Sequence, residues 1–286
     1  MPGNRIRFCG RVTPHAWPNR LKDEEPVPII TLLTDFGDQD GYVAAMKGVI
    51  LSIAPDVTLV DITHAIAPQA IQQAAYVLAQ AVPFFAPGAI HVAVVDPGVG
   101  SARRPLAVQT ASAIFIGPDN GLFSTVLENA AGYVCIHLDQ PRFWRAQPSP
   151  TFHGRDVFAP VAAHLARQVP LADLGTPISD PVRLRVDAPR RQPDGTLIGA
   201  IIHVDHFGNL ISNIPGAWLT TDDWQVRIGQ TTVVGIQPHF AAAPIGALLA
   251  YRGSAGTLEI GERNGHAGQT LGVGVGQTLA AEPRRH

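Results

Sequence analysis

The chain has 286 residues, of which 46% are hydrophobic and 15% charged, and its formal net charge is −2. This length can bury one large core or two modest ones. The absence of a basic excess argues against nucleic-acid binding, and no apolar run is long enough to cross a membrane. The N-terminus lacks a signal-peptide pattern, and Cys9 and Cys135 lack the spacing of a zinc or redox site, so we expect a cytoplasmic protein with reduced thiols.

The first part of the chain predicts an α/β domain behind an N-terminal extension. Residues 1–27 are rich in Pro, Arg and Asn without periodicity, so we expect this segment to be disordered. From 28 to 175, apolar runs alternate with helical spacing, which predicts an N-terminal α/β sandwich with a mostly parallel sheet. In chain order we expect a strand at 28–34, a helix at 41–53 with Asp40 as N-cap, a strand at 57–62, a helix at 68–82 opened by Pro68, strands at 90–95, 106–108 and 113–116, a helix at 121–128, a strand at 133–137 and a helix at 153–167.

The pattern changes after residue 175. Residues 176–195 contain several prolines, glycines and arginines and are predicted to form a linker. From 196 to 286 only short strands are expected, which favours an all-β, barrel-like C-terminal domain. These strands are predicted at 197–204, 224–228, 232–235, 247–251, 257–260 and 269–273.

Two carboxylates follow predicted strands of the α/β domain. Asp35 comes directly after the first strand and Asp96 after the third. Ligands of open α/β sheets bind beyond the carboxyl ends of the strands, so both residues are candidates for a binding site. The chain has no G-x-G-x-x-G after its first strand and no G-x-x-x-x-G-K, so a phosphate grip is not expected. A carboxylate at a strand end suits ribose hydroxyls, because it accepts hydrogen bonds from both. The alternative is that both residues only cap helices or turns.

Three further features could carry chemistry. Arg103 follows Asp96 by seven residues across a glycine-rich turn, and His153 begins a predicted helix. No second His or Cys stands at ligand spacing around His153, and the pairs His203/His206 and Asp61/His64 are thin evidence, so we expect no metal. The polar segment 205–213 offers a carboxylate, an aromatic ring and amides for a ligand, although Asx turns alone would explain it.

Five motifs in order resemble the S-adenosylmethionine (SAM) hydroxide adenosyltransferase family, which is related to fluorinases and chlorinases. The resemblance runs from about residue 28 to 273. It rests on Leu33–Gly37, on Val95–Gly100 with Arg103, on Gly117–Gly121, on Phe152–Asp156 and on Asp205–Ile214.

The resemblance implies hydrolysis of SAM to adenosine and L-methionine without a cofactor or metal. It also implies an α/β domain joined to a β-barrel, in a homotrimer whose substrate lies between the N-terminal domain of one subunit and the C-terminal domain of a neighbour. Asp96, Arg103 and His153 match the family's water-handling triad. The residues implied to hold the substrate are Asp35 at the ribose, Asp40 and Asp205 near the methionine ammonium, Ser254 near its carboxylate, Phe207 and Asn209 at the adenine, and Glu262 near the adenine edge.

Some positions depart from the pattern and leave alternatives open. Arg263 stands where the family has an asparagine, and Gln69 stands where halogenases have a tryptophan. A halide-using transferase and a non-catalytic sensor of SAM or adenosine are the alternatives. Related halogenases lack the triad, and a pure binder needs no water-handling cluster, so hydrolysis is the leading hypothesis. The sequence does not identify which member of the triad takes the proton.

Overall fold

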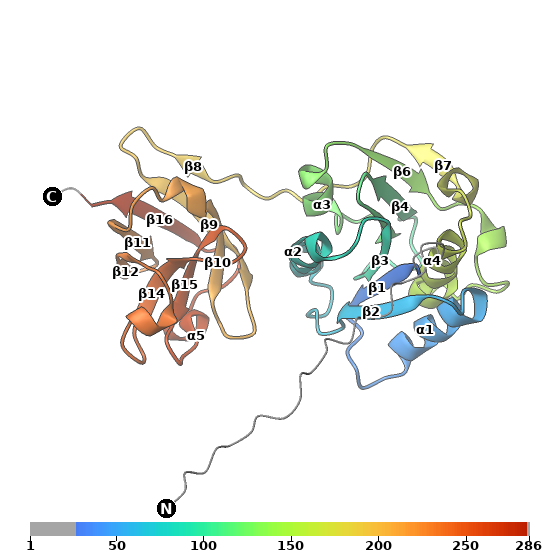
Figure 1. Cartoon of the computed structure of the whole chain (residues 1–286), viewed down its shortest axis with the longest axis horizontal. Coiled ribbons are helices and arrows are strands. Elements are labelled where there is room, and N and C mark those ends of the chain that lie inside the picture. Colours follow the sequence, from blue (N-terminus) through green and yellow to red (C-terminus); the bar gives the residue numbers. More distant parts are fainter. Residues whose placement is uncertain (1–26, 285–286) are drawn as a thin grey trace, which may run out of the picture.

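A seven-stranded sheet in the order β2-β1-β3-β5-β4-β6-β7 organises the N-terminal half of the chain (Figure 1). The structure is a computed structural model that describes residues 27–284. Apart from Val27, the expected N-terminal extension lies outside the described residues, and so does Cys9. Strands β2, β1, β3 and β5 pair in parallel, whereas β4 runs antiparallel to β5 and β6, and β7 runs antiparallel to β6. Five of the seven strands therefore run in one direction. The strands are β1 (Ile29–Thr34), β2 (Thr58–Thr63), β3 (Ala89–Val94), β4 (Pro105–Thr110), β5 (Ala113–Pro118), β6 (Tyr133–His137) and β7 (Thr176–Ile178).

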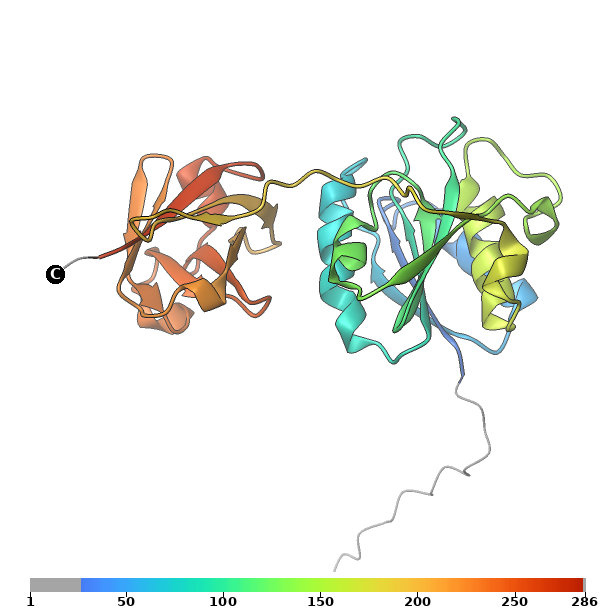
Figure 2. The same cartoon turned by 90° about the horizontal axis from the view of Figure 1, so that it is seen from above.

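Helices cover both faces of this sheet, which gives three layers (Figure 2). Helices α1 (Tyr42–Ile53) and α4 (Ala159–Ala166) pack on one face, and α2 (Ile71–Ala81) and α3 (Ser124–Asn129) pack on the other. Successive strand side chains point to opposite faces, so the central strands must be apolar on both. In β3, Ile90 and Val92 face the first helix pair and Ala93 faces the second. This explains why the central strands are continuous apolar runs in the sequence.

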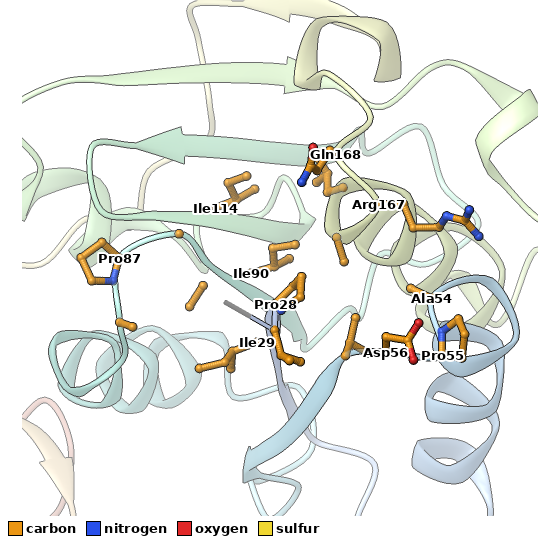
Figure 3. A pocket seen from close by; sticks show the side chains of 17 residues that line it. Pro28, Ile29, Ala54, Pro55, Asp56, Pro87, Ile90, Ile114, Arg167 and Gln168 are labelled. Atoms are coloured by element: carbon orange, nitrogen blue, oxygen red, sulfur yellow. The ribbon is translucent and has the colours of Figure 1, made fainter. Parts of the chain in front are cut away.

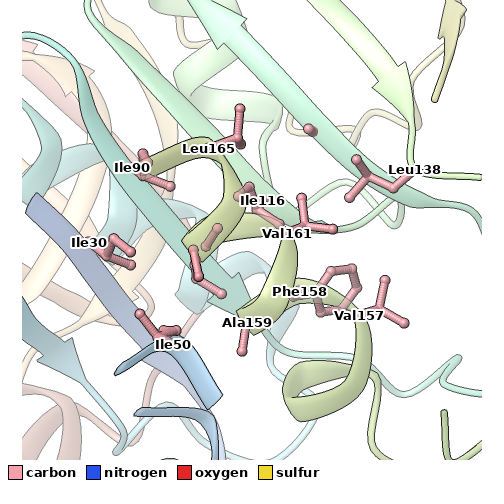
Figure 4. Packing of buried hydrophobic residues seen from close by; sticks show 14 of the residues in the cluster. Ile30, Ile50, Ile90, Ile116, Leu138, Val157, Phe158, Ala159, Val161 and Leu165 are labelled. Carbon is pink, nitrogen blue, oxygen red and sulfur yellow. The ribbon is translucent and has the colours of Figure 1, made fainter. Parts of the chain in front are cut away.

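Helix α4 supplies much of the core on its face of the sheet (Figure 4). Phe158, Val161 and Leu165 pack with Ile90 and Ile116. Phe158 is fully buried, and burying a side chain of this size contributes about 2–3 kcal/mol. A single π-helical turn (Gly154–Phe158) precedes α4, where an uninterrupted helix had been predicted from 153. The core therefore fixes the helix directly behind His153.

The C-terminal half forms one nearly closed, barrel-like sheet in the order β12-β11-β16-β9-β10-β15-β14-β13, with β8 paired to β9. Its interior is a separate apolar cluster. The elements are β8 (Arg190–Arg191), β9 (Leu197–Val204), β10 (Leu210–Pro215), β11 (Trp224–Ile228), β12 (Thr231–Val234), β13 (Ile236–Gln237), β14 (Leu248–Arg252), β15 (Thr257–Glu262), α5 (Ala267–Leu271) and β16 (Thr278–Pro283). The mixed α/β and barrel-like architecture agrees with the fold class predicted from the sequence.

Several predicted boundaries were wrong for local reasons. Asp40 does not cap α1, because Gly41 occupies the N-cap position without a side-chain bond. Pro68 does not open α2, because Gln69 adopts a left-handed φ of 65° that no helix can run through. The strand expected at 269–273 is instead α5, which begins where the His266 side chain accepts from the Gln269 N–H and ends at left-handed Gly272.

Two other segments contain more structure than the sequence indicated. The polar segment 205–213 is a loop only as far as Asn209, after which β10 begins. Strands β7 and β8 lie inside the segment 176–195 that was predicted to be a linker, so only 179–189 and 192–195 lack regular structure there. Strand β16 had no predicted counterpart. No helix among residues 27–284 is long and apolar enough to cross a membrane.

A groove of about 670 Å³ lies at the amino ends of the parallel strands (Figure 3). It is lined by the starts of β1 and β3, including Ile29 and Ile90, and by the residues that follow α1 and α4, including Pro55 and Gln168. None of the candidate site residues lines this groove. The carboxyl ends of the strands, where Asp35 and Asp96 lie, form the opposite edge of the sheet.

The buried His91 makes the stability of the fold sensitive to pH. Its Nδ1 lies 2.7 Å from Thr31 Oγ1, its Nε2 has no hydrogen-bond partner in the described part of the chain, and burial lowers its pKa to about 4. The unfolded chain, with a histidine pKa of about 6.5, binds the proton first. Above pH 6.5 His91 is neutral in both states and the free energy of unfolding is unaffected. As the pH falls from 6.5 toward 4, proton binding to the unfolded chain lowers the free energy of unfolding by at most about 3 kcal/mol.

We predict that His91→Gln will flatten the fall in the free energy of unfolding between pH 7 and pH 4.5, as measured by urea titration at each pH. His206→Gln, at an exposed position of the C-terminal domain, is the matched control and should keep the wild-type slope. Equal slopes in all three proteins would show that His91 titrates normally.

Candidate active site

Asp35 and Asp96 lie at the same edge of the sheet. Strands β1 and β3 are parallel neighbours, with Thr34 opposite Val94. Asp35 directly follows β1, and Asp96 comes two residues after β3. The carboxyl ends of parallel strands meet at one edge, which is the usual position of a ligand site in an open α/β sheet. The structure thus places both carboxylates where the sequence predicted them.

Arg103 joins Asp96 to His153 in one hydrogen-bonded cluster. Arg103 Nε donates to Asp96 Oδ1 at 2.9 Å, and Arg103 Nη2 donates to Asp96 Oδ2. The same Nη2 lies 2.8 Å from His153 Nδ1. The Asp96 and Arg103 side chains are only 6% and 10% exposed, so water competes weakly for these bonds. The turn that holds Asp96 and Arg103 and the distant segment that begins at His153 thus form one unit.

The direction of these bonds sets the protonation of His153. A guanidinium nitrogen can only donate, so His153 Nδ1 must be the acceptor and the neutral ring carries its proton on Nε2. Burial first, and then the charge of Arg103, lower the pKa of His153 below its ordinary value of 6.5. The ring is therefore neutral at pH 7 and presents an N–H donor at Nε2. Arg103 Nη1 is buried without a hydrogen-bond partner among residues 27–284.

A second cluster holds the segment that carries His153. The Asp156 carboxylate is fully buried and accepts from Arg145 Nη1 at 3.0 Å, Arg155 Nε at 2.7 Å and the Ser149 N–H at 2.8 Å. Burial alone would raise the pKa of Asp156, but its bonds with Arg155, Ser149 and Arg145 outweigh that effect and lower it to about 2. Asp156 is the last residue of the motif Phe152–Asp156, but the sequence alone gave it no role. Its one signal in the sequence is Arg155, the arginine directly before it.

Asp35 is held by a backbone group that the sequence did not reveal. The Gln69 N–H donates to Asp35 Oδ2 at 2.9 Å. This bond requires the left-handed conformation of Gln69, an unusual one for a residue with a side chain. Asp35 Oδ1 has no bond to the protein in the described part of the chain. One carboxylate oxygen is therefore fixed while the other can bind a ligand. Asp40 is exposed just beyond this turn.

The C-terminal candidates lie at three places on the barrel-like domain, namely the loop before β10, the turn before β15 and the last residue of β15. Asp205 accepts from the N–H groups of Phe207 and Asn209 and from Asn209 Nδ2, all at 2.8–2.9 Å. This Asx-type loop leaves the Phe207 ring 72% exposed. A Cβ at Gly208, where φ is 83°, would lie 2.2 Å from the His266 ring, so only glycine fits there. The backbone of the loop is held by hydrogen bonds to Asp205, and the loop presents a largely exposed aromatic ring whose ring partner is the neighbouring His206.

The other C-terminal candidates have different surroundings. Glu262 accepts from Thr270 Oγ1 at 2.5 Å. Ser254 is exposed in the turn between β14 and β15. Arg263, the departure from the family pattern, donates to the Ala243 carbonyl at 2.6 Å. Its guanidinium is therefore engaged in holding a neighbouring loop.

The structure brings the candidates together in two groups. Asp35, Asp96, Arg103 and His153 gather at the strand edge, with Asp40 nearby in sequence, and the remaining five lie on the barrel-like domain. Within residues 27–284 no hydrogen bond or ion pair joins one group to the other. Two pairs were considered as metal ligands, His203/His206 and Asp61/His64. In the structure His203 stacks on Tyr76, and His64 lies beside Asp61. The described residues contain no group of three or more His, Cys, Asp or Glu arranged to hold a metal.

The strand-edge group can bind and activate a small oxygen nucleophile. Asp96 retains lone pairs that can accept a proton, His153 Nε2 offers a donor, and Arg103 supplies a fixed positive charge. A ligand held by Asp35 would lie beside this set. The arrangement is that of a water-activating site rather than a phosphate grip.

Comparison with known proteins finds one family over both domains. The N-terminal domain of SAM hydroxide adenosyltransferases matches residues 30–175, and the C-terminal domain of the same family matches residues 199–280. An (R)-S-adenosyl-L-methionine hydrolase from Salinispora arenicola is 41% identical over 254 residues, which cover 88% of this chain and 97% of that protein. A fluorinase from Nocardia brasiliensis is 31% identical over 272 residues, covering 82% of this chain and 89% of the fluorinase.

A solved structure has the same fold. The crystal structure of an uncharacterized conserved protein from Thermotoga maritima matches with a TM-score of 0.84 and 35% identity. The match covers 88% of this chain and 99% of the Thermotoga chain.

We predict that Asp156→Asn will lower the free energy of unfolding by about 2–4 kcal/mol, because the amide removes a buried charge from beside two arginines and turns one acceptor into a donor. Urea denaturation, monitored by tryptophan fluorescence, measures this change in the free energy of unfolding. Arg145→Gln, which removes only the more exposed of the two arginines, should cost less. A stable Asp156→Asn protein would show that the anchor of the His153 segment lies elsewhere.

Proposed function

The chain belongs to the SAM hydroxide adenosyltransferase family, and we propose that it hydrolyses S-adenosyl-L-methionine to adenosine and L-methionine. The observation that carries this function is the cluster of Asp96, Arg103 and His153 at the ligand-binding edge of the sheet. The Salinispora relative, which bears the name of a hydrolase, matches nearly all of its length to this chain and supports the same reaction.

The chemistry of the substrate explains why such a cluster suffices. A sulfonium leaves as a neutral thioether, so the leaving group needs neither a proton nor a metal. The difficult partner is water, which has a pKa of about 15.7 and is a poor nucleophile. The protein must align this water with the ribose C5′ and accept its proton. We therefore propose a reaction without cofactor or metal, in line and with inversion at C5′.

The bonding pattern favours Asp96 as the proton acceptor. His153 Nδ1 already accepts from Arg103, and Nε2 carries a hydrogen, so the neutral ring has no free lone pair for a water proton. Each Asp96 oxygen accepts one bond from Arg103 and keeps a second lone pair. His153 then donates to the water oxygen and orients it. As the bond to C5′ forms, the water becomes acidic, and a carboxylate is a sufficient base.

The substrate-holding roles are proposed from the family pattern, with support from the geometry. Asp35 would bind the ribose hydroxyls, and its free Oδ1 fits that role. Exposed Phe207 would stack on the adenine, which Asn209 would contact. The other proposed contacts are Asp40 and Asp205 to the methionine ammonium, Ser254 to its carboxylate and Glu262 to the adenine edge. Asp205 already accepts three bonds within its loop, so a ligand ammonium would use its remaining lone pairs.

We also propose that two copies of the chain complete each site in a homotrimer. The strand-edge group and the barrel-domain group share no hydrogen bond or ion pair within the described chain, and Phe207 stays largely exposed. A ribose held at Asp35 and an adenine stacked on Phe207 of a neighbouring copy would use both groups.

The configuration at sulfur is a further point that the residues alone do not reveal. The sulfonium is a stereocentre, and the Salinispora hydrolase is named for the (R) form. We propose the (R) epimer as the preferred substrate of this chain, on the strength of that relative.

The function is tested with purified protein and resolved (R) and (S) epimers in ¹⁸O-labelled water, followed by mass spectrometry. We expect adenosine and methionine, one ¹⁸O in the 5′-hydroxyl, faster turnover of the (R) form and no effect of a chelator. Parallel reactions contain chloride or fluoride. Formation of 5′-halo-adenosine would indicate a halogenase, and bound but unreacted substrate would indicate a sensor.

We predict that Asp96→Asn will lower kcat by about 10²–10⁴-fold with little change in KM, because the proton acceptor is lost while substrate contacts remain. His153→Gln should reduce kcat less, since the amide still offers a donor to water. Steady-state kinetics on the preferred epimer compare the two, and adenosine binding confirms that each variant keeps its site. A larger loss in His153→Gln than in Asp96→Asn would assign the base to His153.

A further inference from the structure

The turn that carries Asp35 is tied to the segment after β2 at three points. His64 O accepts from the Gly37 N–H at 2.9 Å, and Gln69 N donates to Asp35 Oδ2 at the same distance. The third tie joins side chains, with Thr34 Oγ1 lying 2.9 Å from His64 Nδ1. Two of the three ties involve His64. The position of Asp35 therefore depends on a residue about thirty positions away in the chain.

The third tie belongs to a longer chain of contacts. Thr34 Oγ1 accepts from the Phe36 N–H at 3.2 Å and keeps its own proton and a second lone pair for His64 Nδ1. On the other side of the ring, His64 Nε2 lies 3.1 Å from Asp61 Oδ1, without the geometry of a hydrogen bond. Lys47 Nζ lies 2.6 Å from the other oxygen of Asp61. The chain of contacts thus runs from Lys47 on α1 to the end of β1.

The burial of this chain of contacts decides what it can do. Asp61, His64 and Thr34 follow the order of a carboxylate–histidine–hydroxyl triad, but Thr34 is fully buried at the end of β1 and cannot reach a substrate. His64 is 14% exposed at its side chain and Asp61 is 39% exposed. The chain of contacts is therefore buried at Thr34, where it meets the turn, and exposed to solvent at Asp61. Its geometry suits holding a backbone rather than attacking a ligand.

We propose that His64 is a positioning residue that fixes the turn Thr34–Gly37 and thereby aims the Asp35 carboxylate at the ribose. The inference rests on the proposed function in one respect, the binding of ribose hydroxyls by Asp35. Without the His64 ring, the buried Thr34 hydroxyl loses its partner, and the turn keeps only its ties to the His64 carbonyl and the Gln69 N–H. Asp35 then points less accurately, and the ligand hydroxyls lose bond strength.

The test compares adenosine with 2′,3′-dideoxyadenosine, which lacks both hydroxyls, by calorimetry on the full chain. His64→Leu should bind adenosine about tenfold more weakly, the loss of roughly one good hydrogen bond, and bind the dideoxy compound as wild type does. His64→Asn, whose Oδ1 can accept from Thr34, should restore most of the affinity. With SAM, His64→Leu should raise KM far more than it lowers kcat. His164→Asn, on α4, is the matched control and should change neither ligand.

A merely structural role would weaken both nucleosides equally, and that result would overturn the proposal. So would an unchanged adenosine affinity in His64→Leu, or a wild type that does not distinguish the two nucleosides. If His64→Leu fails to fold, Asp61→Asn tests the same chain of contacts and should show a smaller loss confined to adenosine. Absence of SAM hydrolysis alongside a selective loss of adenosine binding would refute the proposed reaction but leave the role of His64 intact.

Discussion

The bidentate ion pair between the Arg103 guanidinium and the Asp96 carboxylate is the interaction on which the rest of the site depends. Two nitrogens of one rigid group bind the two oxygens of the carboxylate, and the remaining N–H of Nη2 reaches His153. Because a guanidinium never accepts, this contact fixes which histidine nitrogen is protonated and which residue is left to take a proton. Lysine, a point charge without the planar fork, would satisfy the charge but not this geometry.

The fold brings His153 from a distant segment to the turn that holds Asp96 and Arg103, and the sequence revealed the parts of the site unequally. The apolar runs predicted the central strands, because parallel strands buried on both faces must be continuously hydrophobic. Helix starts were less predictable: α1 begins at Tyr42 with Gly41 at its N-cap, and α2 begins at Ile71, after left-handed Gln69. Helix α5 was missed because it is only five residues long.

The same division holds within the site. Asp35, Asp96, Arg103 and His153 were identifiable because each belongs to a motif. The groups that hold them were not, because Gln69 acts through its backbone, and His64 acts through a partner that only folding brings near. Asp156 was missed because two of its partners, Ser149 and Arg145, are not its neighbours in the chain. Sequence patterns thus indicated the candidate ligand contacts and missed the groups that position them. The proposed direction of proton transfer belonged to the missed part, since it rests on hydrogen-bond geometry and not on residue type.

The movement of positive charge in the proposed reaction explains why a cluster with no net charge suits a cationic substrate. With a neutral His153, the charges of Asp96 and Arg103 cancel. As water attacks, positive charge leaves the sulfur and develops on the attacking oxygen, and the proton then carries it to Asp96. An excess positive field would oppose this movement, whereas an unpaired carboxylate would attract the sulfonium itself and stabilise the ground state. A halide nucleophile needs no base, so the requirement for Asp96 arises from the choice of water.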